Sequence, residues 1–428
     1  MKILYLHPNS WTGEYSILVQ FIKMGHCVYV LEQDKNLRKF HCVLMDFFKQ
    51  KGDRIKTLWY NAHREWKKAI TWPLDLITKN KFKGRNLFHV MAVIKHALRV
   101  FQDADVVICA DGYSYAVPAC LLKRWKLFNK PLVVSFIGGD ILDLPDVHVG
   151  QRRTSFNNKM FQLVYKHADI LRPVSPLLKD IILKDGGEAG KIRICPSHIA
   201  VQKLFSDGDD LAKFRNISRE KITQQLGIPG DFRIAVAVSG GDYCKGMHLI
   251  PDALQAARKC LPDLFMIFVG PMNEYLASIK AKSEGLGLSD RVCFVGKVPP
   301  EEVLEYLAAA DVNLSPSLGE GLNMVTVEAG SVGTPSITTK AAGISHWVKT
   351  FDAGTVIRAG EPQVLGEALC DFFAFSREMV EEYQKNALKM STEFQVNKAA
   401  RRLMNIFHEI TERRQGSTVE TNGQHVAD

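Results

Sequence analysis

The segment "VNLSPSLGEGLNMVTVEAGSVGTPSITT" (312–339) contains, in order, a short apolar run, a glycine-flanked turn, a helical pattern and a second β-branched run. Asn323 is a candidate helix N-cap, and we expect the helix over 324–332, before "GTP". This order predicts a strand–helix–strand unit of a parallel sheet. Two glutamates stand out within it: Glu320 lies in the turn, and Glu328 lies just over one turn into the helix.

The same alternation of apolar runs and helical patterns extends in both directions along the chain. The runs are β-branched and apolar on both faces, as parallel strands covered by helices must be. The polar stretch "SDGDDLAKFRNISREK" (206–221) divides them into two series, which predicts two doubly wound sheets in an α/β fold. The expected strands are 2–7, 27–32, 105–110, 131–137, 170–175 and 192–197 in the first series, and 233–239, 264–270, 291–296, 312–317 and 336–339 in the second.

The length of 428 residues exceeds one ordinary core and fits two or three domains. We expect a Rossmann-like N-terminal domain over 1–205 and a second Rossmann-like domain over 206–378. Helical patterns over 379–415 are expected to pack back toward the first domain, and the polar tail 416–428 is expected to be disordered.

The composition is that of a soluble globular protein, with 46% apolar and 24% charged residues. We find neither a signal-peptide pattern nor an apolar stretch long enough to span a bilayer, so we expect a cytoplasmic protein. The nine cysteines are scattered without a CxxC pair, which predicts reduced core thiols and no metal site.

Glycine-containing turns follow several of the expected strands, at the edge where ligands bind in such sheets. They lie at Gly13, 138–140, 240–246, 319–321 and 341–343. Neither a GxGxxG nor a P-loop pattern occurs at a strand–helix junction, so dinucleotide and P-loop sites are not supported. With two such domains, we expect the ligand in a cleft between them.

The two glutamates fit a polyhydroxylated ligand at this edge. Free backbone N–H groups of residues 322–325 would form a positive helix end that suits hydroxyl or phosphate groups. Glu328 can accept two hydrogen bonds from a vicinal diol such as a ribose, and Glu320 can reach a neighbouring hydroxyl group. The alternative interpretation is that Glu320 caps the turn and Glu328 is a solvated helix residue.

The stretch "SPSLGEGLNMVTVEAGSVGTPSITTKAAGISHWV" resembles the donor-sugar signature of the family 4 retaining glycosyltransferases, which have the GT-B fold. "GDYCKGMHLIPDALQAARKCLPDLFMIFVG" resembles the start of that family's second domain, and "HADILRPVSPLLKDIILKDGGEAGKIRICPS" looks like the end of its first. The likeness extends over nearly the whole chain. It implies two Rossmann-like domains that face a cleft, with C-terminal helices.

The resemblance also implies roles for individual residues. Glu328 would hold the nucleotide ribose, Lys245 would contact the diphosphate, and Glu320 would hold the transferred sugar together with the amides of Gly321, Leu322, Asn323 and Met324. Lys245, Glu320 and Asp140 of the "GGD" turn are the expected catalytic residues, and the donor site would also include Gly13, Gly241 and Val298.

The family's chemistry needs fixed positive groups of the protein beside the leaving nucleoside diphosphate, because that group develops negative charge. The resemblance implies no metal, no other cofactor and no protein nucleophile. Several positions depart from the family pattern: the Arg before the Lys is replaced by Ser239 or Gly240, a His by Ile137, and a Glu by His346. These departures leave open whether the usual donors are used.

Residues 35–100 contain 16 Lys or Arg and four acidic residues, a local net charge of +12 against +9 for the whole chain. Interleaved tryptophans suit an anionic membrane surface. A nucleic-acid interface and a simple solvated basic face are the alternatives, but no nucleic-acid-binding motif occurs, so we expect no nucleic-acid partner.

With these patterns, the resemblance implies a retaining hexosyltransferase that moves a sugar from a nucleotide-sugar donor to a glycan or lipid-linked acceptor in cell-surface polysaccharide or glycolipid biosynthesis. We expect it to be peripheral at the inner face of the membrane. The alternatives are a non-catalytic sugar-nucleotide or nucleic-acid binding protein on the same scaffold, and an isomerase of the same shape.

Overall fold

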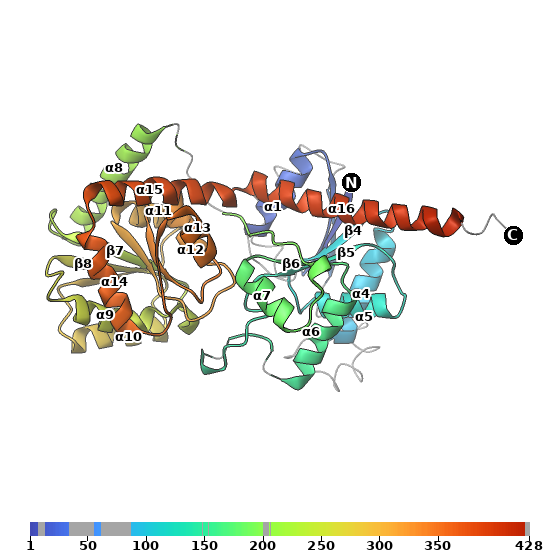
Figure 1. Ribbon diagram of the computed structural model, residues 1–428, viewed down its shortest axis with the longest axis horizontal. Coiled ribbons are helices and arrows are strands. Elements are labelled where there is room, and N and C mark those ends of the chain that lie inside the picture. Colours follow the sequence, from blue (N-terminus) through green and yellow to red (C-terminus); the bar gives the residue numbers. More distant parts are fainter. Residues whose placement is uncertain are drawn as a thin grey trace. The chain divides into compact units, whose positions relative to one another are not determined.

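The computed structural model describes residues 1–6, 13–33, 55–60, 87–147, 149–152, 154–199, 205 and 207–423. The chain divides into two compact units. Unit 1 comprises residues 1–145, 149–200 and 396–428, and unit 2 comprises residues 146–148 and 201–395. Figure 1 labels the elements of both units.

Unit 1 is built on a six-stranded parallel sheet in the order β3-β2-β1-β4-β5-β6. Its described strands are β1 (Lys2–Leu6), β2 (Cys27–Gln33), β3 (Ile55–Tyr60), β4 (Val106–Cys109), β5 (Leu132–Phe136) and β6 (Ile170–Pro173). Its described helices are α1 (Gly13–Lys23), α4 (Leu87–Val100), α5 (Ala116–Arg124), α6 (Ser155–His167), α7 (Pro176–Lys184) and α16 (Val396–Gly423).

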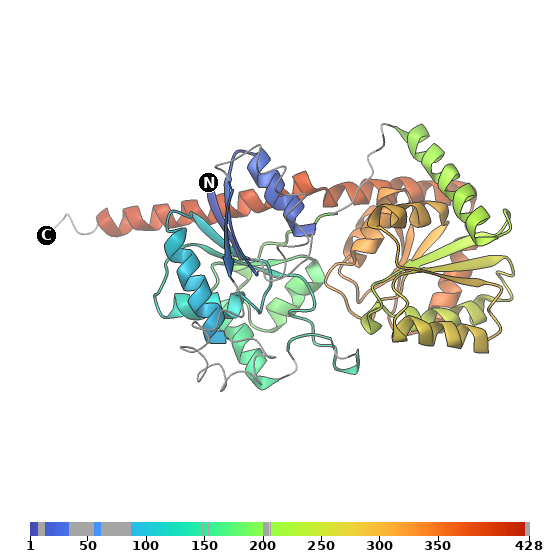
Figure 2. The same cartoon turned by 180° about the vertical axis from the view of Figure 1, so that it is seen from behind.

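Helices cover both faces of this sheet (Figures 1 and 2). Buried residues of α1 and α16 form one core with Ile3, Tyr5, Val28 and Val30, which alternate along their strands as the two-residue period requires. The rings of Phe21 in α1 and Phe407 in α16 are 5.9 Å apart. The C-terminal helix is therefore an integral part of the unit 1 core.

Unit 2 carries a second six-stranded parallel sheet, in the order β12-β11-β10-β7-β8-β9. Its strands are β7 (Arg233–Val238), β8 (Leu264–Val269), β9 (Val292–Gly296), β10 (Val312–Ser315), β11 (Ser336–Thr339) and β12 (Gly354–Ile357). Its α-helices are α8 (Gly208–Leu226), α9 (Ile250–Ala257), α10 (Glu274–Gly285), α11 (Pro300–Ala309), α12 (Met324–Ser331), α13 (Ser345–Phe351), α14 (Pro362–Ala374) and α15 (Arg377–Ser391).

The central strand β7 shows how unit 2 fills two cores. Ala235 and Ala237 pack with α9, α10 and α14, whereas Ile234 and Val236 pack with α8, α11 and α12. Because successive side chains of a strand point to opposite faces, a run apolar at every position must be covered on both sides. The continuous apolar runs of the sequence therefore predicted this layered arrangement correctly.

Several sequence-based expectations need correction. Residues 192–197 do not form a strand; only Ile192 makes an isolated bridge to Leu171. Residues 416–423, expected to be disordered, continue α16. The N-terminal part of unit 1 extends to residue 200 rather than 205, and of the last two helices α15 lies in unit 2 while α16 lies in unit 1.

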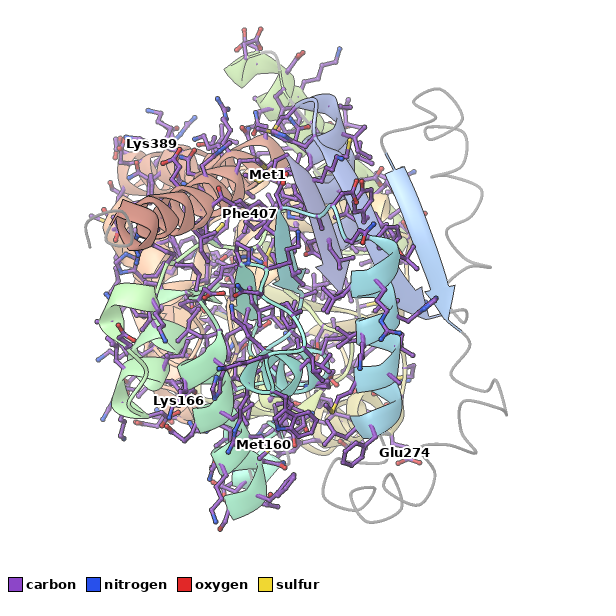
Figure 3. All side chains as sticks on the ribbon, turned by 90° about the vertical axis from the view of Figure 1, so that its right-hand side faces the viewer. Met1, Met160, Lys166, Glu274, Lys389 and Phe407 are labelled. Atoms are coloured by element: carbon purple, nitrogen blue, oxygen red, sulfur yellow. A yellow bond between two sulfur atoms is a disulfide. The ribbon has the colours of Figure 1, made fainter. Side chains whose placement is uncertain are left out.

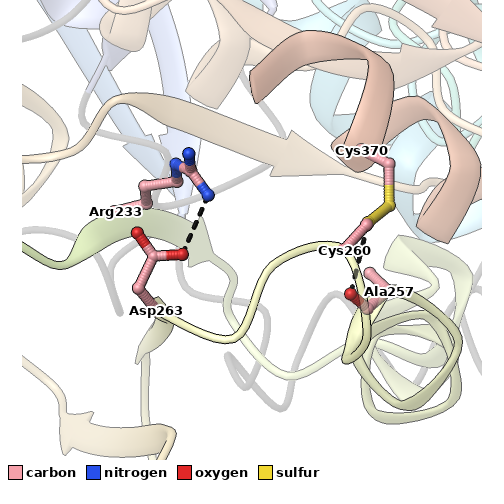
Figure 4. Close-up of a disulfide and its surroundings, with 5 residues drawn as sticks. All are labelled: Arg233, Ala257, Cys260, Asp263 and Cys370. Atoms are coloured by element: carbon pink, nitrogen blue, oxygen red, sulfur yellow. Dashed lines mark hydrogen bonds and ion pairs between the residues drawn. A yellow bond between two sulfur atoms is a disulfide. The ribbon is translucent and has the colours of Figure 1, made fainter. Parts of the chain in front are cut away.

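The cysteines also differ from the prediction of nine reduced core thiols. Cys260, an exposed residue after α9, forms a disulfide with Cys370 of α14, near the Arg233–Asp263 ion pair (Figure 4). The two helices pack side by side, so residues 110 positions apart in sequence come within bonding distance. Six further cysteines are free, and Cys42 lies outside the described residues.

Most of the basic segment 35–100 also lies outside the described residues, apart from β3 and α4. Its predicted contact with a membrane therefore stays a prediction. None of the described helices has the length and apolar character that a bilayer span requires.

Candidate functional site

Two adjacent strands of unit 2, β7 and β10, lead into loops at the same edge of the sheet. From β7 the chain proceeds to β8 and β9 on one side, whereas β10, β11 and β12 lie on the other. This reversal is a topological switch point, where the loops at the carboxyl ends of the strands separate and leave room for a ligand. Lys245 follows β7 and Glu320 follows β10, so the fold brings both predicted residues to this point.

Lys245 and Glu320 form an ion pair across the two loops. Glu320 accepts a second hydrogen bond, of 3.0 Å, from the Ser317 hydroxyl. The backbone fixes this geometry as well, because the Leu318 N–H donates to the Cys244 carbonyl at 2.8 Å and the Glu320 N–H donates to the Ala341 carbonyl at 3.0 Å. The carboxylate and the ammonium group are therefore presented by tightly joined loops.

The backbone conformation at residue 246 explains why a glycine follows Lys245. The φ of Gly246 is +69°, and a Cβ atom there would lie 2.0 Å from the Pro316 carbonyl oxygen. Only glycine permits both this left-handed conformation and this close approach of the two loops. The Lys-Gly pair thus serves the contact that places Lys245 beside Glu320.

Asn323 begins helix α12 as predicted. Its side-chain oxygen accepts from the Thr326 N–H at 3.0 Å, and its amide nitrogen donates to Ser315 and, at 3.3 Å, to Ser317. The residue has φ +83°, which lies in the left-handed region that asparagine tolerates better than most residues. These bonds anchor the helix start to the end of β10.

Several backbone amide groups at this helix start find no partner within the described part of the chain. Among the described residues, no acceptor is found for the backbone N–H groups of Gly321, Leu322, Asn323 or Met324. A helix N-terminus carries partial positive charge, and such N–H groups bind anionic or hydroxylated ligands. The four amides assigned from the sequence are thus available for a ligand.

Glu328 lies in α12, within electrostatic reach of Lys245. Burial of its carboxyl group raises its pKa to about 7, and the nearby Lys245 partly opposes this rise. No hydrogen-bond partner of this carboxyl group is found among the described residues, although the side chain keeps some exposure. A carboxylate withdrawn from water without a partner is typical of a binding site rather than of a solvated helix face.

The other residues predicted for the donor site lie at the same sheet edge of unit 2, except Gly13. Gly241 has φ +90°, and its carbonyl accepts from the Asn273 side chain at 3.2 Å. Val298 follows β9 and is half buried against the apolar core of that sheet face. Gly13 is the first residue of α1 in unit 1, where the preceding loop lies outside the described residues.

Sequence reasoning missed an aromatic group next to Lys245. The rings of Tyr243 and His248 stack with their centroids 4.1 Å apart, and His248 Nδ1 lies 2.9 Å from the Tyr275 hydroxyl group. Tyr243 is 48% exposed, so its ring offers an apolar surface beside the site. The "DYCKGMH" spacing was the only available signal, and the partner Tyr275 comes from α10.

In unit 1, Asp140 is fully engaged by the backbone. Its carboxylate accepts from the N–H groups of Gly112, at 2.7 Å, Gly138, at 2.8 Å, and Ile137, at 3.1 and 3.2 Å. Burial nevertheless raises its pKa to about 6, because desolvation outweighs these bonds and the neighbouring Asp111 adds repulsion. Asp140 thereby ties the loop after β5 to the loop after β4.

A family model matches part of unit 2. Residues 218–390 match the family model described as glycosyl transferases group 1. The chain is 30% identical over 182 residues to a D-inositol 3-phosphate glycosyltransferase of Corynebacterium urealyticum, which covers 40% of this chain and 43% of that protein. The chain therefore spans less than half of the length of this relative.

Two longer matches extend over both units. WcaL of Salmonella typhimurium, whose name assigns it provisionally to colanic acid biosynthesis as a glycosyltransferase, is 23% identical over 431 residues, which covers 94% of this chain and 97% of that protein. The crystal structure of Anabaena HepE in complex with UDP matches with a TM-score of 0.69 at 19% identity, covering 96% of this chain and all of that one. The fold is GT-B.

Proposed function

We propose that this chain, whose residues 218–390 match the glycosyl transferases group 1 model, transfers a sugar from a nucleotide-sugar donor to a glycan or lipid-linked acceptor. The observation that carries this proposal is the arrangement of Lys245, Glu320 and Glu328 at the switch point of β7 and β10. We propose that this transfer serves cell-surface polysaccharide or glycolipid biosynthesis, since the name of WcaL, which matches over nearly the whole chain, refers to colanic acid.

The donor diphosphate would replace Glu320 as the ion-pair partner of Lys245. In the structure these two side chains neutralise each other. A diphosphate brings more negative charge than one carboxylate, so it competes well for the ammonium group, and the released Glu320 can then accept hydrogen bonds from sugar hydroxyl groups. One ion pair thus prepares both the phosphate contact and the sugar contact.

The leaving group would be stabilised without a metal ion. Breaking the sugar–phosphate bond develops charge on the nucleoside diphosphate, and Lys245 together with the free amides of residues 321–324 can meet that charge. Because these donors are fixed before the reaction, they need no reorganisation in the transition state. We propose that no cofactor and no protein nucleophile take part, and that the anomeric configuration of the sugar is retained by front-face attack.

Glu328 would hold the ribose of the donor. Its carboxyl group has a pKa of about 7 in the ligand-free chain, so near neutral pH it is only partly ionised. Two hydroxyl groups of a ribose would supply the hydrogen bonds that this buried carboxylate lacks, and they would favour its ionised form. Nucleotide binding should therefore cause the Glu328 carboxyl group to release a proton to the solvent.

The acceptor would bind through unit 1, as the family resemblance implies. Asp140 would serve there as a positioning residue that shapes the loops after β4 and β5, since its carboxylate already accepts from three backbone N–H groups. We further propose a peripheral location at the cytoplasmic face of the membrane, which suits a lipid-linked acceptor and the basic segment 35–100.

The alternative is a protein that binds nucleotide sugars without catalysis. Ser239 and Gly240 occupy the place of the family's arginine, so one diphosphate contact is absent at that position. Release of free nucleoside diphosphate from UDP-, GDP- and ADP-sugars, measured with and without lipid-linked saccharide acceptors, separates the two functions. Acceptor-dependent release that falls in Lys245→Ala supports the transferase, whereas nucleotide binding without release under any condition would favour the binding protein.

A further inference from the structure

A hollow of about 930 Å³ lies at the edge of the unit 1 sheet where strands β5 and β6 begin. The end of α5 and the turn after it, the end of α6, residues 188–191 and two residues of α16 enclose it. Its volume is in the range of small-molecule sites. The Asp140 loop follows β5 and therefore lies at the opposite edge of this parallel sheet. We call this cavity the amino-edge hollow.

The lining of the amino-edge hollow is positively charged. Five Lys or Arg and two acidic residues give it a net charge of +3. These are Lys123, Lys126, Lys166, Lys191 and Arg413, with Asp169 and Glu188. Asp169 pairs with Lys123, and Glu188 pairs with Lys191 at 3.3 Å. Within the described part of the chain, no acidic side chain pairs with Lys126 or Lys166, so both keep their charge for a ligand. Figure 3 shows the side chain of Lys166 near the end of α6.

His167, which also lines the hollow, responds to this charge. The pKa of its imidazole is lowered, first by burial and then by the positive charges of Lys166, Arg124, Lys191 and Lys123. Four cations thus act on one ring from three segments of the chain. An anion in the hollow would oppose them and would raise the pKa of His167.

The ends of helices α5 and α6 do not cancel this charge. A helix C-terminus carries partial negative charge because its last carbonyl groups lack partners, and it would repel an anion. Here the Lys191 ammonium group donates to the Lys166 carbonyl at 3.1 Å and to the Tyr165 carbonyl at 3.5 Å. The backbone N–H groups of residues 126 and 127 donate to carbonyl groups in the last turn of α5, at 3.0 and 2.9 Å. These carbonyl groups are therefore satisfied without a ligand.

The turn that carries Lys126 is firmly held. Lys126 has φ +57°, at the position that glycine usually fills after a helix. The Lys123 ammonium group pairs with Asp169 and donates to the Lys130 carbonyl at 3.3 Å. Asp169 also accepts from the Leu132 N–H at 2.8 Å, at the start of β5. Because this part of the lining is ordered before a ligand arrives, binding costs less conformational entropy.

We propose that the amino-edge hollow binds a soluble small molecule that carries two or more phosphate groups. Lysine ammonium groups form strong charge-assisted hydrogen bonds with phosphate oxygens. The cations come from separate segments around one hollow, so a row of phosphates matches them better than a single phosphate. A second hollow of about 420 Å³ adjoins the same turn and adds Lys95, Arg99 and Lys130 to the positive surface.

This site is separate from the proposed sugar transfer. Its residues belong to unit 1, whereas Lys245, Glu320 and Glu328 belong to unit 2. A bilayer at this edge would face away from the Asp140 loops, beside which a lipid-linked acceptor would bind, so we assign a soluble ligand. Such a ligand would join α5, α6 and α16 and would stabilise unit 1 against unfolding.

Calorimetric titration of inorganic triphosphate into the full chain at pH 7 tests the proposal. The ionic strength is kept near 0.01 M, where the Debye length is about 30 Å. The four proteins compared are the parent, Lys126→Gln with Lys166→Gln, Lys385→Gln with Lys389→Gln, and Lys245→Ala. The second pair is the matched control, because it removes two exposed lysines from α15. Circular dichroism without ligand confirms that each variant is folded.

We expect the parent to bind triphosphate and the Lys126 and Lys166 variant to bind about 25-fold more weakly. Each charge contributes about fivefold at 4 Å, even with the dielectric constant of water. The α15 control should bind as the parent does. Lys245→Ala should keep this binding, because the hollow does not contain Lys245, and this result separates the hollow from the donor site.

Nuclear magnetic resonance of the histidine rings gives a second readout at the site itself. Triphosphate should raise the pKa of His167 in the parent but not in the variant of Lys126 and Lys166. The His167→Gln variant identifies the signal. A purely structural role of the lysines would leave this titration the same with and without triphosphate.

Any of four results would overturn the proposal. The parent could fail to bind triphosphate, or the variant of Lys126 and Lys166 could bind as tightly as the parent. The α15 control could lose as much affinity as that variant, which would indicate a general charge effect. Finally, binding could be lost in Lys245→Ala alone, which would assign the anion to the donor site of unit 2.

Discussion

Replacement of Glu328 by glutamine should stabilise the ligand-free protein at alkaline pH. The carboxyl group has a pKa of about 7 in the folded chain against an ordinary value of 4.5. Because its folded pKa is raised, its protonated form favours folding below about pH 4.5, and this contribution is lost as the pH rises through 7. Above pH 7 the folded chain keeps an ionised group that would be better solvated in the unfolded chain.

The shift corresponds to roughly 3 kcal/mol, an upper value because the side chain keeps some exposure to water. The neutral amide of Glu328→Gln does not carry this cost. For a unit of this size, about 1 kcal/mol changes the melting temperature by about 2–4 °C. The variant should therefore melt several degrees above the parent at pH 8, whereas only a small part of this difference should remain at pH 5.

Differential scanning fluorimetry of parent and variant from pH 5 to pH 8 measures this difference. Glu284→Gln, at an exposed position of α10, is the matched control and should shift melting at no pH. A difference that is the same at pH 5 and pH 8 would show that ionisation of Glu328 is not its source. Destabilisation of the variant at pH 8 would show that the carboxylate has partners in the free chain.

Four further substitutions test other contacts. Lys245→Ala should lower turnover about 10²-fold or more with a smaller change in nucleotide affinity, and equal turnover would exclude its contact with the leaving group. Asp140→Ala should lower the free energy of unfolding by roughly 1–3 kcal/mol, because several buried N–H groups lose their acceptor; unchanged melting would contradict that role. Gly246→Ala should weaken donor binding and stability together, since its Cβ would meet a carbonyl oxygen at 2.0 Å, and normal binding would show that the loops tolerate separation. Cys370→Ser should remove up to about 4–5 kcal/mol by freeing a long loop, and reduction of the parent should reproduce the loss if the disulfide stabilises the chain.

The strands that sequence reasoning found share one property, which is apolar character on both faces. The expected strand 264–270 agrees with β8 within one residue, and the expected strand 336–339 coincides with β11. The missed strands are of another kind. β3 (Ile55–Tyr60) lies within a strongly basic segment, and β12 (Gly354–Ile357) is a four-residue edge strand that starts with glycine, so neither sequence shows a continuous apolar run.

The candidate site was predictable where it depends on local order along the chain. Asn323 as N-cap and α12 from Met324 follow from a short segment. The Lys245–Glu320 ion pair joins residues 75 positions apart and depends on β7 and β10 being neighbours, which the sequence alone does not reveal. The disulfide between Cys260, which follows α9, and Cys370 of α14 depends in the same way on packing between distant elements.

The central claim is that the β7–β10 edge of unit 2 binds a nucleotide through its ribose and diphosphate. Calorimetric titration of UDP into the parent, Glu328→Gln and Glu284→Gln at pH 8 tests this claim most directly. UDP is the first choice because HepE, which shares the fold, was crystallised with it, and GDP and ADP follow in the same format. The account predicts that the best of the three binds the parent and the Glu284 variant equally and binds the Glu328 variant more weakly by roughly 1.5–3 kcal/mol. Equal affinity of all three proteins for that nucleotide, or no binding of any nucleotide to the parent, would contradict it.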